Sequence, residues 1–244
     1  MAVLKGALIS FPPAGGLGPP LPNVIVFQMN PETITHAWTE AAAPQPPPGD
    51  TTTHVSALAV TGAPGESFSF TLMLDSDEQQ ADVSIDPVGA ALASVSGVYT
   101  RLSALELLQF PSSSPISNLV GQVTAAASAL SQGVSASGSS SQPVPTSEVP
   151  VVLFVWGPLR VLPVRVSALS ITEKLYDEAL NPTHAEAQIT LTVLTPQELT
   201  TVQPPMNAIA TAAYSYTQAL RQAQAIANLA ESASNILGML PVSL

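Results

Sequence analysis

The sequence predicts an α+β protein in which antiparallel β-sheet predominates and a long helix follows the sheet. Two apolar, β-branched runs, 161–173 and 185–195, flank the polar segment 176–183, which is the pattern of a long β-hairpin. In the second run apolar residues alternate with Glu, Gln and Thr, so one face is expected in the core and the other against water or another protein. Residues 206–240 place apolar and small residues at spacings of three and four, which predicts one long helix.

The remaining strands are predicted from shorter runs bounded by turn residues. They are expected at 2–11, 23–29, 34–40, 65–74 and 149–156. Asn30-Pro31 lies between the second and third of these runs, so we expect those two strands to form a hairpin. The run 65–74 alternates Phe68 and Phe70 with polar residues, as a half-buried strand does.

Helical and connecting segments complete the predicted organisation. Residues 87–110 carry one apolar stripe, which predicts a helix covering a face of the sheet. The Pro-rich segment 41–53 is a connector, and the Ser/Gly/Ala-rich segment 112–149 is an insertion. We therefore expect a β domain over 1–201 and a helical extension over 202–244, which either docks on its own domain or packs against neighbours.

Composition and charge narrow the classes of function. Only 9% of the 244 residues are charged, against roughly 25% in average chains, and a neutral surface of this kind suits burial against partner subunits. The net charge of −11 and six scattered cations argue against nucleic acid, which requires clustered cations. The chain has no cysteine, no pattern typical of a signal peptide, and no apolar run of membrane-spanning length, so direct membrane insertion is not expected.

The usual signatures of catalysis, metal binding and cofactor binding do not occur in the sequence. There is no HExxH, GxSxG or P-loop, and we expect no enzymatic activity, cofactor or metal. Gly15-Gly16-Leu17-Gly18 runs into Pro19-Pro20, which opposes a dinucleotide site, and the acidic segment 75–86 lacks the glycine and terminal glutamate of a calcium loop.

Several segments together resemble a known protein family. Residues 26–34, VFQMNPETI, resemble the family's FQYNPETL segment, and residues 150–157 resemble a strand that ends in Trp-Gly. Residues 166–194 are similar to a hairpin whose loop carries a proline followed by a basic residue or histidine, here Pro182 and His184. The family is the tube and baseplate proteins of contractile injection systems, which are phage-tail-like particles, and the resemblance covers roughly residues 1–200.

The resemblance implies a phage tail-tube-like barrel or sandwich with a flanking helix, assembled as a ring of six copies. Within that family the chain is similar to a tube-initiator or hub-adaptor protein. Many such relatives carry a C-terminal LysM module, whereas this chain carries the predicted helix 206–240 in its place. The resemblance therefore does not imply that this chain binds peptidoglycan.

The expected function is that of a structural component of a contractile injection system. The chain would form a homohexameric ring at the junction of inner tube and baseplate or spike, where it initiates or adapts the tube. Its partners would be other copies of itself, the inner tube protein, and spike, hub and other baseplate proteins. It would be cytoplasmic at synthesis and assembly, in a particle that stays intracellular or is released.

Particular residues are expected to carry the contacts and the fold. The expected subunit contacts, through exposed strand edges of the hairpin, are Ser167, Leu169, Ile171, Glu173, Glu186, Gln188, Thr190 and Thr192. The expected fold anchors are Phe27, Asn30, Pro31, Phe154, Trp156, Gly157 and Pro182.

Two other functions remain alternatives from the sequence. One is a monomeric β-rich module that binds a small ligand or a glycan, although the chain has few aromatic residues. The other is a hydrolase that uses Asp177, Glu178 or the acidic segment 75–86.

Overall fold

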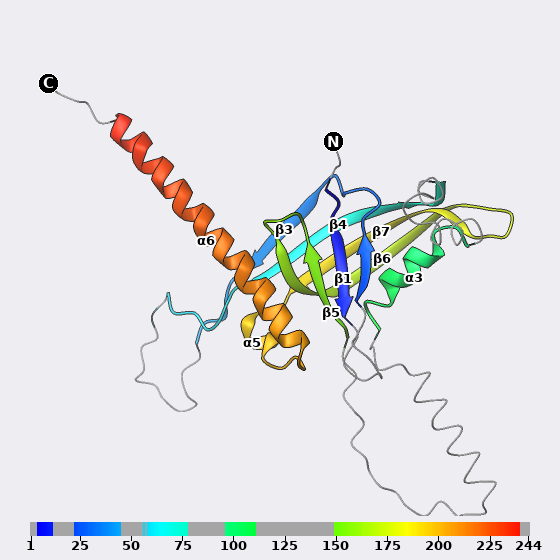
Figure 1. The fold of residues 1–244 in the computed structure, drawn as a ribbon, viewed down its shortest axis with the longest axis horizontal. Helices are drawn as coiled ribbons and strands as arrows, with labels where there is room; N and C mark the ends of the chain where they lie inside the picture. The colour runs from blue at the N-terminus through cyan, green and yellow to red at the C-terminus, as the bar shows by residue number, and fades with distance from the viewer. Residues whose placement is uncertain are drawn as a thin grey trace, which may run out of the picture.

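The computed structural model describes residues 4–11, 22–44, 56, 58–77, 96–110 and 149–239. The expected insertion at 112–149 lies almost wholly outside these residues, as do the first part of the expected helix 87–110 and most of the connector 41–53. Within the described part the chain is an α+β protein, as predicted, with a seven-stranded antiparallel sheet and a C-terminal helix (Figure 1).

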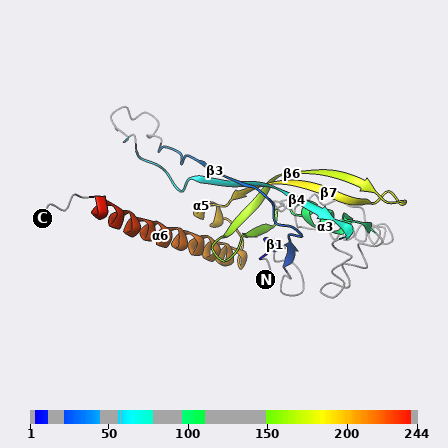
Figure 2. The same ribbon diagram turned by 90° about the horizontal axis from the view of Figure 1, so that it is seen from above.

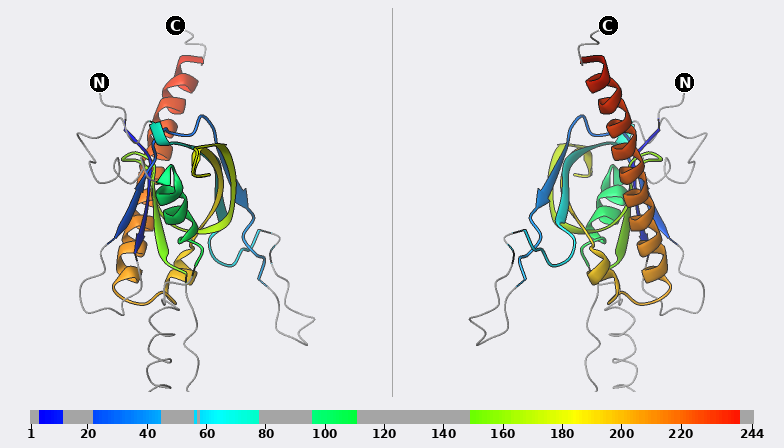
Figure 3. Two further views of the ribbon diagram at one scale, coloured as in Figure 1. Left: turned by 90° about the vertical axis from the view of Figure 1, so that its right-hand side faces the viewer. Right: turned by 90° about the vertical axis from the view of Figure 1, so that its left-hand side faces the viewer.

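The strands join into one sheet in the order β2-β1-β5-β6-β7-β4-β3. Their bounds are Ala7–Phe11 (β1), Asn23–Val26 (β2), Ile34–Thr39 (β3), Gly65–Asp75 (β4), Val151–Val155 (β5), Val161–Tyr176 (β6) and Pro182–Val193 (β7). The predicted long hairpin is confirmed as β6 and β7, which pair from Val164 opposite Val193 to Tyr176 opposite Pro182. The sheet is strongly curved, and helix α3 (Tyr99–Glu106) lies on its concave side (Figure 3).

The predicted hairpin of the second and third strands is wrong, because β2 and β3 lie at opposite ends of the sheet. β2 pairs with β1, and β3 pairs with β4. The segment 27–33 instead crosses from the edge strand β2 to the opposite edge strand β3, and we call it the crossing segment. An Asn-Pro pair between two strand-like runs fits this crossing as well as it fits a tight turn, so the local pattern alone could not distinguish them.

Aromatic side chains fill the centre of the concave face. Phe154 is fully buried and lies between Phe68 and Phe70, with ring centroids 5.3 and 5.6 Å away. Phe27 packs against Phe70 at 5.6 Å and against Trp156 at 6.2 Å. Phe68 and Phe70 come from β4, Phe154 from β5, Trp156 from the residue after β5, and Phe27 from the crossing segment, so aromatic contacts join these parts across the concave face.

A β-bulge at Ser167 changes which residues of β6 face the core. The register shifts between Val166, opposite Leu191, and Ala168, opposite Thr190, and the Ser167 hydroxyl donates to the Thr190 carbonyl at 3.1 Å. Core-facing positions are even-numbered before the bulge and odd-numbered after it. An extra residue in one strand produces this change of face.

The expected single helix over 87–110 is interrupted within the described residues. Gly97 has a φ of +57°, and α3 begins only at Tyr99. The Val98 amide donates to the Pro182 carbonyl at 3.0 Å, which joins the start of α3 to the hairpin. Apolar side chains of α3 and its flanks then enter the core: Val98, Leu102, Leu105 and Leu108.

Two helices follow the sheet. α5 (Pro196–Leu199) begins with a capping box between Thr195 and Glu198, and α6 spans Met206–Met239, in agreement with the predicted long helix. Buried residues at helical spacing dock the first half of α6: Met206, Ala210, Ala213 and Thr217. From Gln222 to Glu231 every side chain is exposed, and the helix projects beyond the sheet (Figures 1 and 2). The first half of α6 therefore docks on its own domain, as one of the two expectations had it, and packing of the exposed half against neighbours stays a prediction.

Candidate functional site

The predicted contact residues of the hairpin lie on two opposite faces of the sheet. Leu169 stands opposite Ile189, and Ile171 opposite Ala187, so both point toward the core. Glu186, Gln188, Thr190 and Thr192 alternate with those core residues and point the other way. Glu173 shares the core-facing side, and Ser167 is the bulge residue. The set therefore does not form one continuous surface, and only its β7 half lies on the outer face.

The prediction that both strands of the hairpin offer free edges is wrong for β7. β7 pairs with β6 on one side and with β4 on the other. β6 pairs with β5 only from Val161 to Val164, so among the described strands its longer part has β7 as its single partner. The sequence pattern shows alternation, but strand order depends on contacts distant in sequence.

The outer face of β3, β4, β7 and β6 is rich in hydroxyl groups. We call it the hydroxyl face, and its hydroxyl residues are Thr35, Thr39, Ser67, Ser69, Thr71, Ser170, Thr172, Thr190 and Thr192. Ser69 and Thr190 stand opposite each other, and their hydroxyl oxygens are 2.8 Å apart. This face is wide and polar, and short neutral side chains occupy most of its positions.

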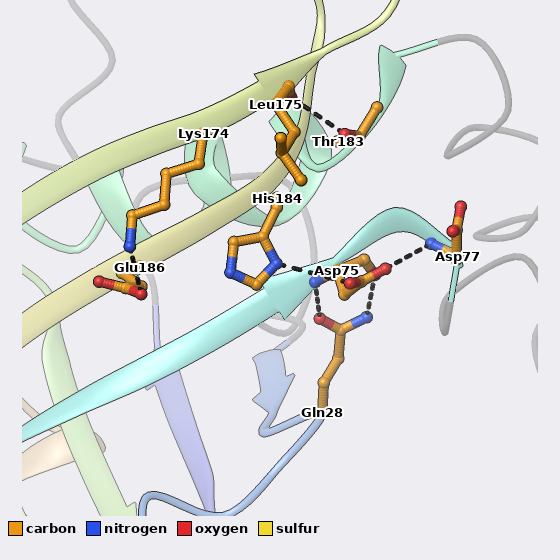
Figure 4. A network of polar contacts seen from close by, with 8 residues as sticks. All are labelled: Gln28, Asp75, Asp77, Lys174, Leu175, Thr183, His184 and Glu186. Carbon is orange, nitrogen blue, oxygen red and sulfur yellow. Dashed lines mark hydrogen bonds and ion pairs between the residues drawn. The ribbon is translucent and has the colours of Figure 1, made fainter.

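Charged residues gather at one end of the hydroxyl face (Figure 4). Lys174 on β6 donates to a carboxylate oxygen of Glu186 on β7. His184 on β7 lies with its Nδ1 3.5 Å from a carboxylate oxygen of Asp75 on β4. The pKa of Glu186 is lowered, chiefly by the hydrogen bond from Lys174 and further by the charges of Lys174 and His184.

Replacing Lys174 with glutamine is expected to raise the pKa of Glu186 toward its ordinary value. A depressed carboxyl pKa contributes stability above the unfolded pKa, and this contribution is lost as the pH falls through the folded pKa. The free energy of unfolding of the variant should therefore depend less on pH in the acid range than that of the parent chain. Carboxyl NMR titration of both proteins checks the shift, and an unchanged Glu186 titration would contradict it.

The crossing segment ties the two ends of the sheet together through side-chain amides. Gln28 donates from Nε2 to the Asp75 carbonyl at 2.8 Å and accepts from the Asp75 amide at 2.9 Å, which continues the ladder of β4 beyond the end of β3. Asn30 accepts from the Gly6 amide at 2.9 Å and donates to the Leu4 carbonyl at 2.8 Å. The FQMN part of the segment thus binds the backbone before β1 and the end of β4.

Replacing Gln28 with alanine is expected to destabilise the protein by about 2 kcal/mol, because the buried amide satisfies two backbone groups of Asp75. Chemical denaturation measures the change. Gln188→Ala is the matched control, since Gln188 is exposed on β7 and its loss should change the free energy of unfolding little. Equal effects of the two substitutions would contradict the assigned role of Gln28.

The other predicted anchors lie close to this segment or at the two ends of the hairpin. Phe27 and Phe154 are in the core, and Trp156 is partly buried against it. Gly157 has a φ of +68° in the β5–β6 turn, and Pro182 is buried at the start of β7. Pro31 is half-buried where the crossing segment leads into β3.

A buried ion cluster, which the sequence pattern did not indicate, holds α6 on the sheet. The Glu66 side chain on β4 is 3% exposed, and both of its oxygens accept from the Arg221 guanidinium of α6. His36 on β3 lies with its Nε2 2.8 Å from a Glu66 oxygen, and Arg221 also stacks over Trp38 at 5.0 Å. Arg160, between β5 and β6, interacts electrostatically with this cluster. Burial lowers the pKa of Arg160, and the positive charge of Arg221 lowers that pKa further.

Two of the carboxylates considered for hydrolysis, Asp75 and Asp177, have structural partners. One Asp177 oxygen accepts from the Ala179 and Asn181 amides, and the other accepts from the Asn181 side chain. These hydrogen bonds, with the Asn181 side chain foremost, lower the pKa of Asp177. The Asp75 carboxylate accepts from the Asp77 amide and lies 3.5 Å from His184 Nδ1, while Glu78, Asp82 and Asp86 lie outside the described residues. Asp177 therefore organises the hairpin loop.

The described residues contain no group of three or more His, Asp or Glu side chains arranged to hold a metal ion. Among the described helices, none has the length and apolar character that crossing a bilayer requires. No protein-family model matches the chain, and no curated protein matches it.

Proposed function

We propose that the protein is a structural component of a contractile injection system and forms a homohexameric ring where the inner tube meets the baseplate or spike. Its curved sheet would be a tail-tube-like fold in which β1, β2 and β5 form one layer. The strands β3, β4, β7 and β6 would form the other. The ring would initiate or adapt the tube, with the inner tube protein and spike or hub proteins as its axial partners.

One observation carries the proposal: the layer of β1, β2 and β5 has apolar side chains on both faces. Leu8 and Ile25 face the core, while Ile9 and Val24 stand opposite each other on the outer side. Val24 and Val26 are 51% and 46% exposed. Apolar sheet surface in water favours burial against another protein surface, and a neighbouring copy in a ring would supply one.

The hydroxyl face supports the same proposal from the other layer. A wall of short neutral side chains can border an aqueous channel or a second polar subunit without leaving charges buried. The four strands that carry this face are held together by long registers, so the wall would be rigid. In the proposed ring this face lines the lumen or a subunit contact.

Light scattering on the purified full chain tests the ring. The proposal predicts a species of six chain masses that dissociates on dilution. A monodisperse species of one chain mass at every concentration would contradict it and would favour the monomeric binding module.

A further inference from the structure

The tip of the long hairpin presents two leucines in an unusual backbone conformation. Leu175 has a φ of +52° and Leu180 a φ of +64°, in the left-handed region. Their side chains are 71% and 74% exposed, and Tyr176 between them is 54% exposed. These three side chains, which we call the apolar tip, lie at the end of β6 and β7 that points away from α6 (Figure 1).

Among the residues that the structure describes, burial within the chain does not account for leucine at these two positions, because both side chains are largely exposed. Glycine or asparagine adopts the left-handed region more readily, and hairpin loops of this length commonly place glycine there. An exposed leucine gains little burial within its own chain to offset the strain. Strained residues of this kind cluster at binding sites, so the tip is a candidate contact surface.

The tip is also ordered before any contact forms. Asp177 accepts three hydrogen bonds from Ala179 and Asn181, its amide donates to the Asn181 carbonyl, and Leu180 donates to the Asp177 carbonyl. A loop that is fixed in advance loses little conformational entropy on binding. The hydrogen bonds of Asp177 therefore fix the loop conformation in which the apolar tip would dock.

Charge and apolar character point to a partner surface on the chain itself. Glu173, Asp177 and Glu178 make the tip acidic, while Lys174 is already paired with Glu186. The outer side of β1 and β2, which we call the receiving face, carries Ala7, Ile9, Val24 and Val26, and the exposed cation Lys5 precedes β1. An apolar, acidic tip and an apolar face beside a cation are complementary.

We infer that the apolar tip of one copy docks on the receiving face of a second copy. The two surfaces differ, so the contact is head-to-tail, and repeated head-to-tail contacts close into a ring when the rotation allows it. The inference rests on the proposed ring and names the contact that would build it.

Cysteine cross-linking tests the contact in a chain that has no cysteine of its own. A Leu180→Cys chain is mixed with a Val24→Cys chain and oxidised. A parallel mixture replaces the second chain with Thr71→Cys, an exposed position on the hydroxyl face. We expect the 180–24 product to exceed the 180–71 product at least tenfold, and equal yields would overturn the inference.

A second variant separates docking from folding. Leu180→Gly relieves the backbone strain, so we expect a denaturation midpoint equal to or above that of the parent chain. The same change should raise the concentration at half-assembly at least tenfold. Leu159→Gly is the matched control, because Leu159 is an exposed leucine in the β5–β6 turn, and it should leave assembly unchanged. Unchanged assembly of Leu180→Gly would overturn the inference.

The outcomes also distinguish this inference from the proposed function. A six-chain species without the 180–24 product would retain the ring and overturn the tip contact. A selective 180–24 product in a dimer or an open chain would retain the contact and overturn the hexamer. A monomer without a selective product would overturn both.

Discussion

Replacing Arg221 with alanine is expected to lower the free energy of unfolding by about 3 kcal/mol, because a buried carboxylate then loses its main counter-charge. Glu66 is almost fully buried, and Arg221 binds both of its oxygens. Among the described residues, His36 would remain as the side-chain partner of Glu66. The variant should also expose α6 to proteolysis, since the guanidinium joins this helix to β4.

Arg165→Ala is the matched control, because Arg165 is exposed on β6 and should change stability by less than about 0.5 kcal/mol. The double variant Glu66→Gln with Arg221→Met should recover part of the loss, because it leaves no unpaired charge in the core. Chemical denaturation of the four proteins measures these differences. Equal stability of the Arg221→Ala and Arg165→Ala proteins would show that the ion pair does not hold the helix.

Replacing Gly97 with alanine is expected to destabilise the protein by about 3 kcal/mol or to prevent folding. The φ of +57° costs an L-residue about 1–2 kcal/mol. An added Cβ would also lie 2.2 Å from the Pro182 carbonyl oxygen, which is backbone and cannot rotate away. Relieving that overlap requires a shift of α3 or of the hairpin, which adds about 1–3 kcal/mol.

Gly157→Ala separates the two contributions. Gly157 has a similar φ of +68°, but an added Cβ would meet no atom within 4 Å. We therefore expect a loss of about 1 kcal/mol from the backbone conformation alone. Thermal or chemical unfolding of both variants checks the difference, and equal losses would refute the close approach of Gly97 to Pro182.

The sequence predicted most elements because their signals are local. Alternation along 65–74 and 185–195 and the helical spacing of 206–240 correspond closely to β4, β7 and α6. Strand order could not be predicted in the same way, since β2 and β3 follow each other in the chain and yet lie at opposite ends of the sheet. That arrangement depends on Gln28 and Asn30 binding backbone groups distant in sequence, which no periodicity records.

The candidate sites were predictable to different degrees. Alternation identified the β7 half of the hydroxyl face, but the bulge at Ser167 reversed the faces of β6 beyond it. The change from even to odd apolar positions between Val166 and Leu169 is a sequence signal that would have shown this. Glu66 and Arg221 are far apart in the chain, and nothing in the sequence pairs them. The strained leucines of the tip likewise depend on loop geometry.

Electron microscopy of the purified chain tests the proposed ring. We predict class averages with six-fold symmetry, in which the hairpin tip of each copy lies on the β1–β2 layer of the next. Particles of single-chain size, or rings with another symmetry, would contradict the proposed hexameric tube or baseplate component.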